Sequence, residues 1–194
     1  DLALGQVQDG WGDIDTLSGI EAVYGSQHAD FLLGSNASFE RFRGRGGNDT
    51  IDGRGNFDEV DYWNSAVAMG VFVNLQLGYA YDGLGGTDSL ANIEAVRGSE
   101  QADTLIGTDG GFNRFRPMAG NDIVQAANGT DVGTDELDYN LAPNGVSINL
   151  ATGIATDGWG GTDTLIGTFE NANGTNFGND VIIGNAVSNI LRGS

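Results

Sequence analysis

The sequence predicts an all-β fold, a solenoid of short strands joined by Gly-Asp turns, and three observations support this prediction. One passage occurs three times, as DGWGDIDTL from Asp9, DGLGGTDSL from Asp82 and DGWGGTDTL from Asp157. Glycine fills 33 of the 194 positions and proline only 2, so the chain turns often and turns on glycine. No segment carries the 3.6-residue apolar period of a helix. Units that repeat in register stack and bury their apolar faces on each other.

The repeats organise the chain as a single solenoid, 1–194, with internal repeats 1–73, 74–148 and 149–194, the last of which is incomplete. The passage that follows the first motif also recurs, as GIEAVYGSQHADFLLG from Gly19 and NIEAVRGSEQADTLIG from Asn92. Both ends of the chain fall inside a repeat. We therefore expect the chain to be a piece of a longer array.

A shorter period lies within each repeat. DTI from Asp49 is followed nine residues later by DEV from Asp58, and DVI from Asp180 precedes NIL from Asn189 by the same interval. An apolar residue two positions after the acidic or amide residue predicts a short strand whose alternate side chains face inward. Two such units make one coil of about 18 residues, and neighbouring coils are expected to pair as parallel strands.

The charge of the chain is strongly negative. It has 27 acidic residues against 8 basic ones and a net charge of −19. Such a chain repels itself when compact unless cations neutralise it. Nucleic acid and anionic membranes require basic patches, so we exclude both as partners. Cysteine is absent, which excludes disulfides and thiolate metal sites, and no apolar stretch is long enough for membrane insertion.

The turn sequences resemble a known family. GRGGNDTID from Gly44 is similar to the nonapeptide G-G-x-G-x-D-x-U-x of RTX (repeats-in-toxin) proteins, and GRGNFDEVD from Gly53 is a weaker neighbour. MAGNDIVQ from Met118 and FGNDVIIG from Phe177 are partial matches. The resemblance implies a right-handed parallel β-roll or β-helix, Ca²⁺ in the turns, and export by a type I secretion system to a secreted or cell-surface location.

The residue types in these turns suit calcium. Ca²⁺ takes six to eight oxygen ligands and accepts both carboxylates and backbone carbonyls. Glycine allows the positive φ angles that aim carbonyls at an ion. The alternative for each aspartate is a solvated turn residue without metal. The candidate metal ligands are the following: Asp49, Asp58, Asp122, Asp135 and Asp180, with Gly44, Gly46 and Asn48 of the first turn; Asp15, Asp88 and Asp163 of the GGTD-type loops; Asp9, Asp82 and Asp157 six residues earlier; and Asp30 and Asp103.

Two further sets of residues recur. Trp11, Leu84 and Trp159 share one loop position, where they either form a platform for sugars or pack beneath the turn. Arg41 and Arg43 recur as Arg114 and Arg116, which either capture an anionic polysaccharide or neutralise neighbouring acidic rows. His28 has Gln101 as its counterpart, which argues against a catalytic or zinc role.

No catalytic motif interrupts the repeats, so we expect a protein that is not an enzyme. The expected function is a calcium-binding structural or adhesive module of a large secreted or surface bacterial protein, which folds on Ca²⁺ after export. Its expected partners are calcium, a surface polysaccharide and neighbouring repeats. The alternatives are a secretion and folding appendage of a secreted enzyme, or a carbohydrate-binding module. Ice binding would need regular ranks of threonine, which the scattered threonines do not supply.

Overall fold

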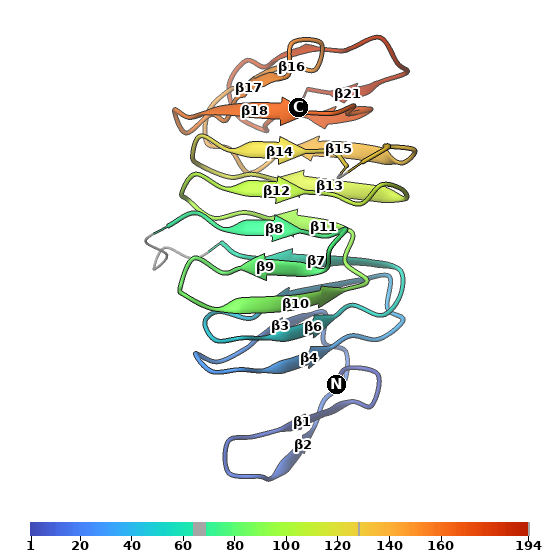
Figure 1. Ribbon diagram of the computed structural model, residues 1–194, viewed down its shortest axis with the longest axis vertical. Helices are drawn as coiled ribbons and strands as arrows, with labels where there is room; N and C mark the ends of the chain where they lie inside the picture. Colours follow the sequence, from blue (N-terminus) through green and yellow to red (C-terminus); the bar gives the residue numbers. More distant parts are fainter. Residues whose placement is uncertain (64–68, 128, 194) are drawn as a thin grey trace.

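The chain folds as a stack of short β-strands in the computed structural model, which describes residues 1–63, 69–127 and 129–193 (Figure 1). These residues form 21 strands, and no helix occurs among them. Accordingly, the described part of the chain has no helix of the length and apolarity needed to cross a membrane. The all-β prediction is confirmed.

One face of the stack is an eight-stranded sheet in which every pairing is parallel, here called the parallel sheet. Ala22 lies beside Arg41 and Arg41 beside Glu59, so a regular coil takes 19 or 18 residues (41 − 22 and 59 − 41), as predicted. The strands, from the N-terminal end of the stack, are β3 (Ala22–Tyr24), β5 (Phe39–Arg43), β7 (Phe57–Asp61), β11 (Ala95–Arg97), β13 (Phe112–Arg116), β15 (Thr134–Asp138), β19 (Asn171–Asn173) and β21 (Ile190–Arg192).

The other face is an eleven-stranded sheet, here called the mixed sheet because it contains both parallel and antiparallel pairs. Its strands, from the same end, are β4 (Phe31–Leu33), β6 (Thr50–Asp52), β10 (Thr87–Ala91), β9 (Tyr79–Tyr81), β8 (Phe72–Asn74), β12 (Thr104–Ile106), β14 (Ile123–Gln125), β18 (Thr162–Ile166), β17 (Ile154–Thr156), β16 (Ser147–Asn149) and β20 (Val181–Ile183).

The mixed sheet departs from a purely parallel solenoid at the long-period motif. The passages from Asp82 and Asp157 are the turns of antiparallel hairpins, β9–β10 and β17–β18. β8 and β16 extend these hairpins to three-stranded meanders. The N-terminal copy forms the separate hairpin of β1 (Gln6–Gln8) and β2 (Ile14–Thr16), at the blue end of the chain in Figure 1. The two sheets are therefore long and mostly parallel, with antiparallel insertions in the mixed sheet at residues 72–91 and 147–166.

The core consists of the inward-facing residues of both sheets. Strands of three to five residues place alternate side chains on opposite faces. The apolar residue two positions after the turn aspartate is fully buried at Ile51, Val60, Leu105, Val124 and Leu137, whereas Ile182 after Asp180 is only partly buried. The predicted inward position of these residues is confirmed, and it places the preceding acidic residue at the edge of the core.

Candidate metal centres in the turns

Acidic side chains form a column beside the mixed sheet, one in each turn. Each carboxylate accepts a hydrogen bond from the backbone of the adjacent coil. Asp49 Oδ1 accepts the N–H of Asp30 at 2.9 Å, and Asp88 Oδ1 accepts that of Asp49 at 3.0 Å. In the next repeat Asp122 Oδ1 accepts the N–H of Asp103 at 2.8 Å, and Asp163 does the same for Asp122 at 3.0 Å. The column thus joins consecutive coils through one carboxylate oxygen per turn.

A second column precedes the strands of the parallel sheet. Asp58 Oδ1 accepts the N–H of Glu40 at 3.0 Å, and Glu94 Oε2 accepts that of Asp58 at 2.9 Å. Asp135 accepts a hydrogen bond from Asn113 Nδ2 at 2.7 Å and donates its own N–H to Glu170. Glutamate and asparagine therefore take the place of aspartate in several turns of this column.

Several of these carboxylates have one oxygen without a partner. Although buried, the Oδ2 atom receives no hydrogen bond within the described residues in Asp49, Asp58, Asp82, Asp122, Asp131 and Asp135. Asp49, Asp58, Asp122 and Asp135 are themselves at most 1% exposed. A buried anionic oxygen without a donor is costly unless a cation neutralises it. Of these six residues, only Asp131 is not among the ligands predicted from the sequence.

The turns before Asp49, Asp58 and Asp122 share one backbone conformation. In each of these turns the second and the fourth residue have a positive φ, a backbone conformation that residues other than glycine rarely adopt. These pairs are Arg45 (75°) with Gly47 (117°), Arg54 (68°) with Asn56 (80°), and Met118 (74°) with Gly120 (144°). We call these the Gly-rich turns, residues 44–49, 53–58 and 117–122.

A different turn satisfies its aspartate internally. In turn 98–103, Ser99 donates its N–H to Asp103 Oδ2 at 2.6 Å and its hydroxyl to Oδ1 at 2.7 Å. Ser26 donates in the same way to Asp30 Oδ2. Asp180 accepts the N–H groups of Thr175 and Val146. We call turns 25–30, 98–103 and 174–180 the Ser/Thr turns, because a hydroxyl residue follows the first glycine.

The hairpin motif places its aspartates in two roles. Asp82 Oδ1 accepts the N–H of Gly86 at 2.8 Å, and Asp157 caps its own turn in the same way. Asp88 lies inside the stack, where its Oδ2 accepts the hydroxyl of Tyr62 at 3.0 Å. Asp163 and Tyr139 form the equivalent bond at 2.7 Å. Both oxygens of Asp88 and Asp163 are therefore satisfied by the protein itself.

In the N-terminal hairpin the same motif lacks these neighbours. Asp9 caps its turn by accepting the N–H of Trp11 and of Asp13. Asp15, the counterpart of Asp88, is exposed on β2. The three copies of one sequence therefore occupy two environments, buried in the stack and open at its end.

Three other residues were predicted as ligands in the first Gly-rich turn. A Cβ atom at Gly44 would lie 2.1 Å from Asp49 Oδ2, so only glycine fits beside this oxygen. Gly46 is buried, and a Cβ there would meet Gln27 Oε1 at 3.0 Å. Asn48 is exposed and accepts the N–H of Thr87 at 2.9 Å. Its side chain therefore fastens the β9–β10 hairpin to the turn.

Burial raises the pKa of several of these carboxylates. Burial together with Glu40 raises the pKa of Asp58 to about 7, and burial raises that of Asp135 to about 8. The better satisfied Asp88 and Asp103 reach about 6, again through burial. Burial, with the nearby carboxylates of Asp163 and Asp103 as further causes, also raises the pKa of Asp122.

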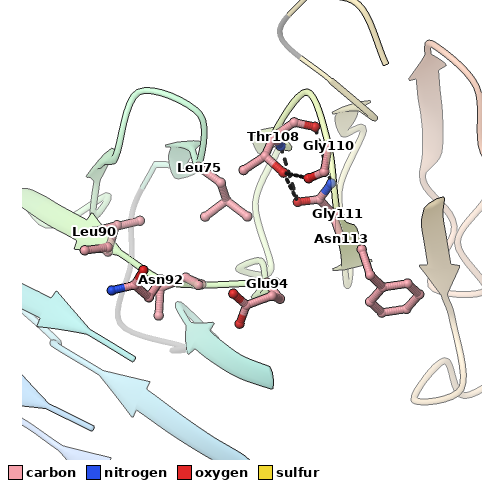
Figure 2. A pocket seen from close by; sticks show the side chains of 11 residues that line it. Leu75, Leu90, Asn92, Glu94, Thr108, Gly110, Gly111 and Asn113 are labelled. Atoms are coloured by element: carbon pink, nitrogen blue, oxygen red, sulfur yellow. Dashed lines mark hydrogen bonds between the residues drawn. The ribbon is translucent and has the colours of Figure 1, made fainter. Parts of the chain in front are cut away.

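The second column is interrupted by a cavity of about 330 Å³ between Glu94 and Asn113 (Figure 2). Leu75 and Leu90 line it on one side, and Thr108 and Asn113 bond to each other on the other side. The equivalent residues of the first repeat, including Glu21 and Glu40, line a smaller cavity of about 160 Å³. The gap is thus a feature of the repeat.

The turns fit a cation that draws on backbone oxygens. Within the described ranges, no three histidine or acidic side chains converge on one point, so carboxylates alone do not complete a site. A Cβ at Gly86 would lie 1.8 Å from the carbonyl oxygen of Gly47 and 2.6 Å from Asp82 Oδ2. A carbonyl of one coil and a carboxylate of the next therefore approach the same small space. This mixture of oxygens is the donor set that calcium prefers.

The recurrent arginines lie on the outer surface of the parallel sheet. Arg41 pairs with Glu59 at 2.6 Å, and Arg114 pairs with Glu136 at the same distance. Arg43 pairs with Asp61 at 2.5 Å. Neutralisation of neighbouring acidic residues is confirmed, but the partners are strand residues and not the turn aspartates.

The recurrent loop position lies in the hairpin turns. Trp11 is 92% exposed, whereas Leu84 and Trp159 are 38% and 37% exposed.

Tyr62 and Tyr139, which donate hydrogen bonds to Asp88 and Asp163, were not predicted from the sequence to have a role. The DY pair at Asp61 and Asp138 was the available signal for them.

Neither a protein-family model nor a curated protein matches the chain.

Proposed function

We propose that the chain is a calcium-binding module of the RTX type, a right-handed β-roll that serves as a structural or adhesive unit of a large secreted or surface bacterial protein. The observation that supports it best is the buried Oδ2 without a donor in all three Gly-rich turns, at Asp49, Asp58 and Asp122. The right-handed winding follows the rule for crossovers between parallel strands. No catalytic role is assigned, because every candidate carboxylate recurs in a neighbouring coil.

In this proposal the Gly-rich turns hold the ion. Asp49, Asp58 and Asp122 supply charge through Oδ2, while Oδ1 remains bonded to the adjacent coil. Asp82 and Asp135 are further ligands of the same kind. Bound calcium supplies the positive charge that these buried oxygens lack. The Ser/Thr turns, in which the protein satisfies Asp30, Asp103 and Asp180, are packing turns.

Calcium then controls folding. Extracellular modules bind Ca²⁺ with dissociation constants of about 10⁻⁴–10⁻³ M. Millimolar Ca²⁺ stabilises the fold by roughly 0.4–1.4 kcal/mol per site. In the cytosol, where free calcium is scarce, a chain with net charge −19 stays unfolded and can pass a type I exporter. Outside the cell, several sites act together to form the stack.

Urea unfolding followed by circular dichroism tests the proposal, in EGTA and in 1 mM Ca²⁺, with 1 mM Mg²⁺ as the ion control. Calcium is expected to raise the unfolding midpoint clearly and magnesium to raise it little. The triple variant D49N/D58N/D122N should lose most of this response. D9N/D15N, which removes charges from the open N-terminal hairpin, should keep it. An unfolding midpoint that is the same in EGTA and in Ca²⁺ would contradict calcium binding.

A further inference from the structure

The outer surfaces of the two sheets differ in charge. The described strands of the mixed sheet have one charged residue that faces outward, Asp52, which accepts the N–H of Arg54 and the Nδ2 of Asn92. We call this surface the uncharged face. The outer surface of the parallel sheet, in contrast, has many charged residues: Arg41, Arg43, Glu59, Asp61, Arg97, Arg114, Arg116, Glu136, Asp138 and Arg192. On a molecule with a net charge of −19, a long surface with a single carboxylate is a departure that needs an explanation.

Strand register assembles a continuous row on this face. Adjacent strands lie about 4.8 Å apart, so a row across nine strands extends on the order of 40 Å along the stack. The strand inner positions are buried, as Val73, Leu105 and Ile148 show, and their neighbours in the sequence therefore point outward. The row, here called the outer rank, consists of Thr87, Tyr81, Phe72, Thr104, Ile123, Thr164, Ile154, Asn149 and Ile183.

Three aromatic rings gather near the middle of the stack. Phe72 lies 5.6 Å from Tyr79 and 5.8 Å from Tyr81, measured between ring centroids, and the two tyrosines are 5.5 Å apart. Tyr81 is 52% exposed. Thr87 and Ser89 beside them are exposed and carry hydroxyl groups. Phe72 and Tyr79 are half-buried, and a partly exposed aromatic cluster rimmed by hydroxyl groups is typical of a binding surface.

We propose that the uncharged face binds an extended, neutral polysaccharide that lies along the outer rank. The apolar C–H faces of sugar rings stack on aromatic rings, and sugar hydroxyls pair with threonine, serine and asparagine side chains. The strand spacing is close to the length of one sugar residue in an extended glycan, so successive strands can meet successive sugars. The proposal does not depend on which ion occupies the turns.

Charge selects the neutral class of glycan. A polyanion is repelled by the net charge of −19 and finds no cation among the outward residues of these strands. A basic protein partner finds only Asp52, which is already bonded. A neutral chain meets neither penalty. The arginines of the opposite sheet are already paired with acidic residues, so they do not offer a competing site.

Calorimetry with defined oligosaccharides tests the proposal, on folded protein in saturating calcium. The probes are cellohexaose and mannohexaose, with hexaguluronate as the anionic comparison. At least one neutral hexasaccharide should bind, and Tyr81→Ala should weaken it about tenfold, the loss of one stacking contact. Tyr24→Ala is the matched control, because Tyr24 is also 52% exposed but lies on the charged surface beside Arg43. The Tyr24→Ala variant should bind the neutral hexasaccharide with the same affinity as the unmodified protein.

Several results would overturn this assignment. They are the absence of binding by both neutral probes, binding of hexaguluronate alone, and an equal loss in Tyr24→Ala and Tyr81→Ala. Sedimentation velocity can give a further contradicting result. In that case the protein binds neither neutral probe but forms a dimer, and Tyr81→Ala abolishes the dimer. That outcome would assign the face to a second copy of the chain. None of these results bears on calcium, which circular dichroism measures separately.

Discussion

The Gly-rich turn 44–49 and the Ser/Thr turn 98–103 occupy equivalent positions in the stack but treat their aspartates differently. Both turns end on a buried aspartate that joins adjacent coils by hydrogen bonds. In turn 98–103, Ser99 donates two hydrogen bonds to Asp103. In turn 44–49, Arg45 has a φ of 75°, and Asp49 Oδ2 receives no donor from the described chain. The residue after the first glycine thus distinguishes a turn whose own donors satisfy its aspartate from one that leaves an oxygen of its aspartate without a donor.

This difference means that one scaffold contains two kinds of junction. Ser/Thr turns are expected to hold neighbouring coils together under all ionic conditions, because their donors are part of the chain. The Gly-rich turns lack such hydroxyl and backbone donors. They keep an anionic oxygen in a space that a Cβ atom would fill, as the short distance at Gly44 shows. Calcium dependence is therefore expected to be local to the Gly-rich turns, and experiments that separate the two kinds of turn test this directly.

The largest expected effect is that calcium reverses the pH dependence of the protein's stability, because this effect involves all Gly-rich turns at once. The pKa of Asp58 is raised to about 7, and that of Asp135, which also has an oxygen without a donor, to about 8. The unfolded chain loses these protons near pH 4, so the folded state binds more protons between those values. The stability that these two carboxyl groups contribute to the folded state is fully present below about pH 4 and is lost as the pH rises through 7–8. In EGTA, the urea midpoint should therefore fall between pH 5 and pH 8.5.

Calcium should change the sign of this slope, since the ion binds the deprotonated carboxylates. General repulsion among the acidic residues also lowers stability at high pH, so a control must separate the two causes. D58N/D135N keeps nearly all of that repulsion but removes two of the raised pKa values. A slope in EGTA as steep in this variant as in the unmodified protein would show that the turns are not its source.

The next largest effect is expected at the hairpin that covers the third Gly-rich turn. A methyl group at Gly161 would lie 1.6 Å from the carbonyl oxygen of Gly120 and 2.6 Å from Asp157 Oδ2. Both atoms are fixed by the backbone or by hydrogen bonds, so Gly161→Ala must separate the coils and cost about 3 kcal/mol or more. The free energy of unfolding measures the loss, and the calcium response should decrease with it.

Gly160→Ala serves as the control for this variant. Gly160 has a φ of 114°, but a Cβ there would meet no atom within 4 Å. Its substitution should cost about 1–2 kcal/mol of backbone strain and leave the calcium response intact. Equal losses in the two variants would mean that contact between coils does not matter at this position.

A pair of isosteric substitutions sharpens the comparison between adjacent coils. Asp122→Asn keeps the Oδ1 acceptor for Asp103 and removes the buried charge. In EGTA it should stabilise the fold by about 1–3 kcal/mol, and in Ca²⁺ it should be less stable than the unmodified protein. Asp103→Asn loses an acceptor for Ser99 and should be destabilised by a similar amount in both conditions. Unfolding curves of the two variants in EGTA and in Ca²⁺ check this.

The decisive result is that Asp122→Asn is more stable than the unmodified protein in EGTA and less stable in Ca²⁺. If the variant is less stable than the unmodified protein in EGTA as well, its Oδ2 has a partner among the protein atoms, and the distinction between the turns fails there.

Much of the fold could be predicted from the sequence, because the repeat and the position of the apolar residue after each aspartate are local signals. Ile51 and Val60 face inward as expected. The hairpins were not predicted. The alternation of apolar and polar residues in β8 to β10 has period two in either strand direction, so it contains no signal for antiparallel pairing. The same turns were interpreted as ion loops because their glycines and aspartates suit both roles.

The candidate site was predictable only in outline. The sequence locates the aspartates at the turn ends, but it does not show which oxygens find donors, since some of those donors come from coils 18 or more residues away. Tyr62, 26 residues before Asp88, had no assigned role for this reason, whereas Ser99 lies only four residues before its acceptor Asp103. The threonines show the same limit. Thr87, Thr104 and Thr164 are scattered along the sequence, and the inserted hairpins bring them into one row.

The smallest expected effect tests the hydroxyl that separates the two kinds of turn. Ser99→Ala removes the 2.7 Å hydrogen bond to Asp103 Oδ1 and the acceptor for the N–H of Gln101. The expected loss is about 1.5 kcal/mol, since the lost bond is to a carboxylate. Because Asp103 then has one donor fewer, its pKa should rise further and the stability in EGTA should fall more steeply with pH than in the unmodified protein. Ser38→Ala, at an exposed position of turn 34–40, is the control and should change neither quantity. A Ser99→Ala protein with the same free energy of unfolding and the same pH slope as Ser38→Ala would show that the backbone N–H groups alone satisfy the aspartate. The identity of the second turn residue would then not explain why Asp49 and Asp103 differ.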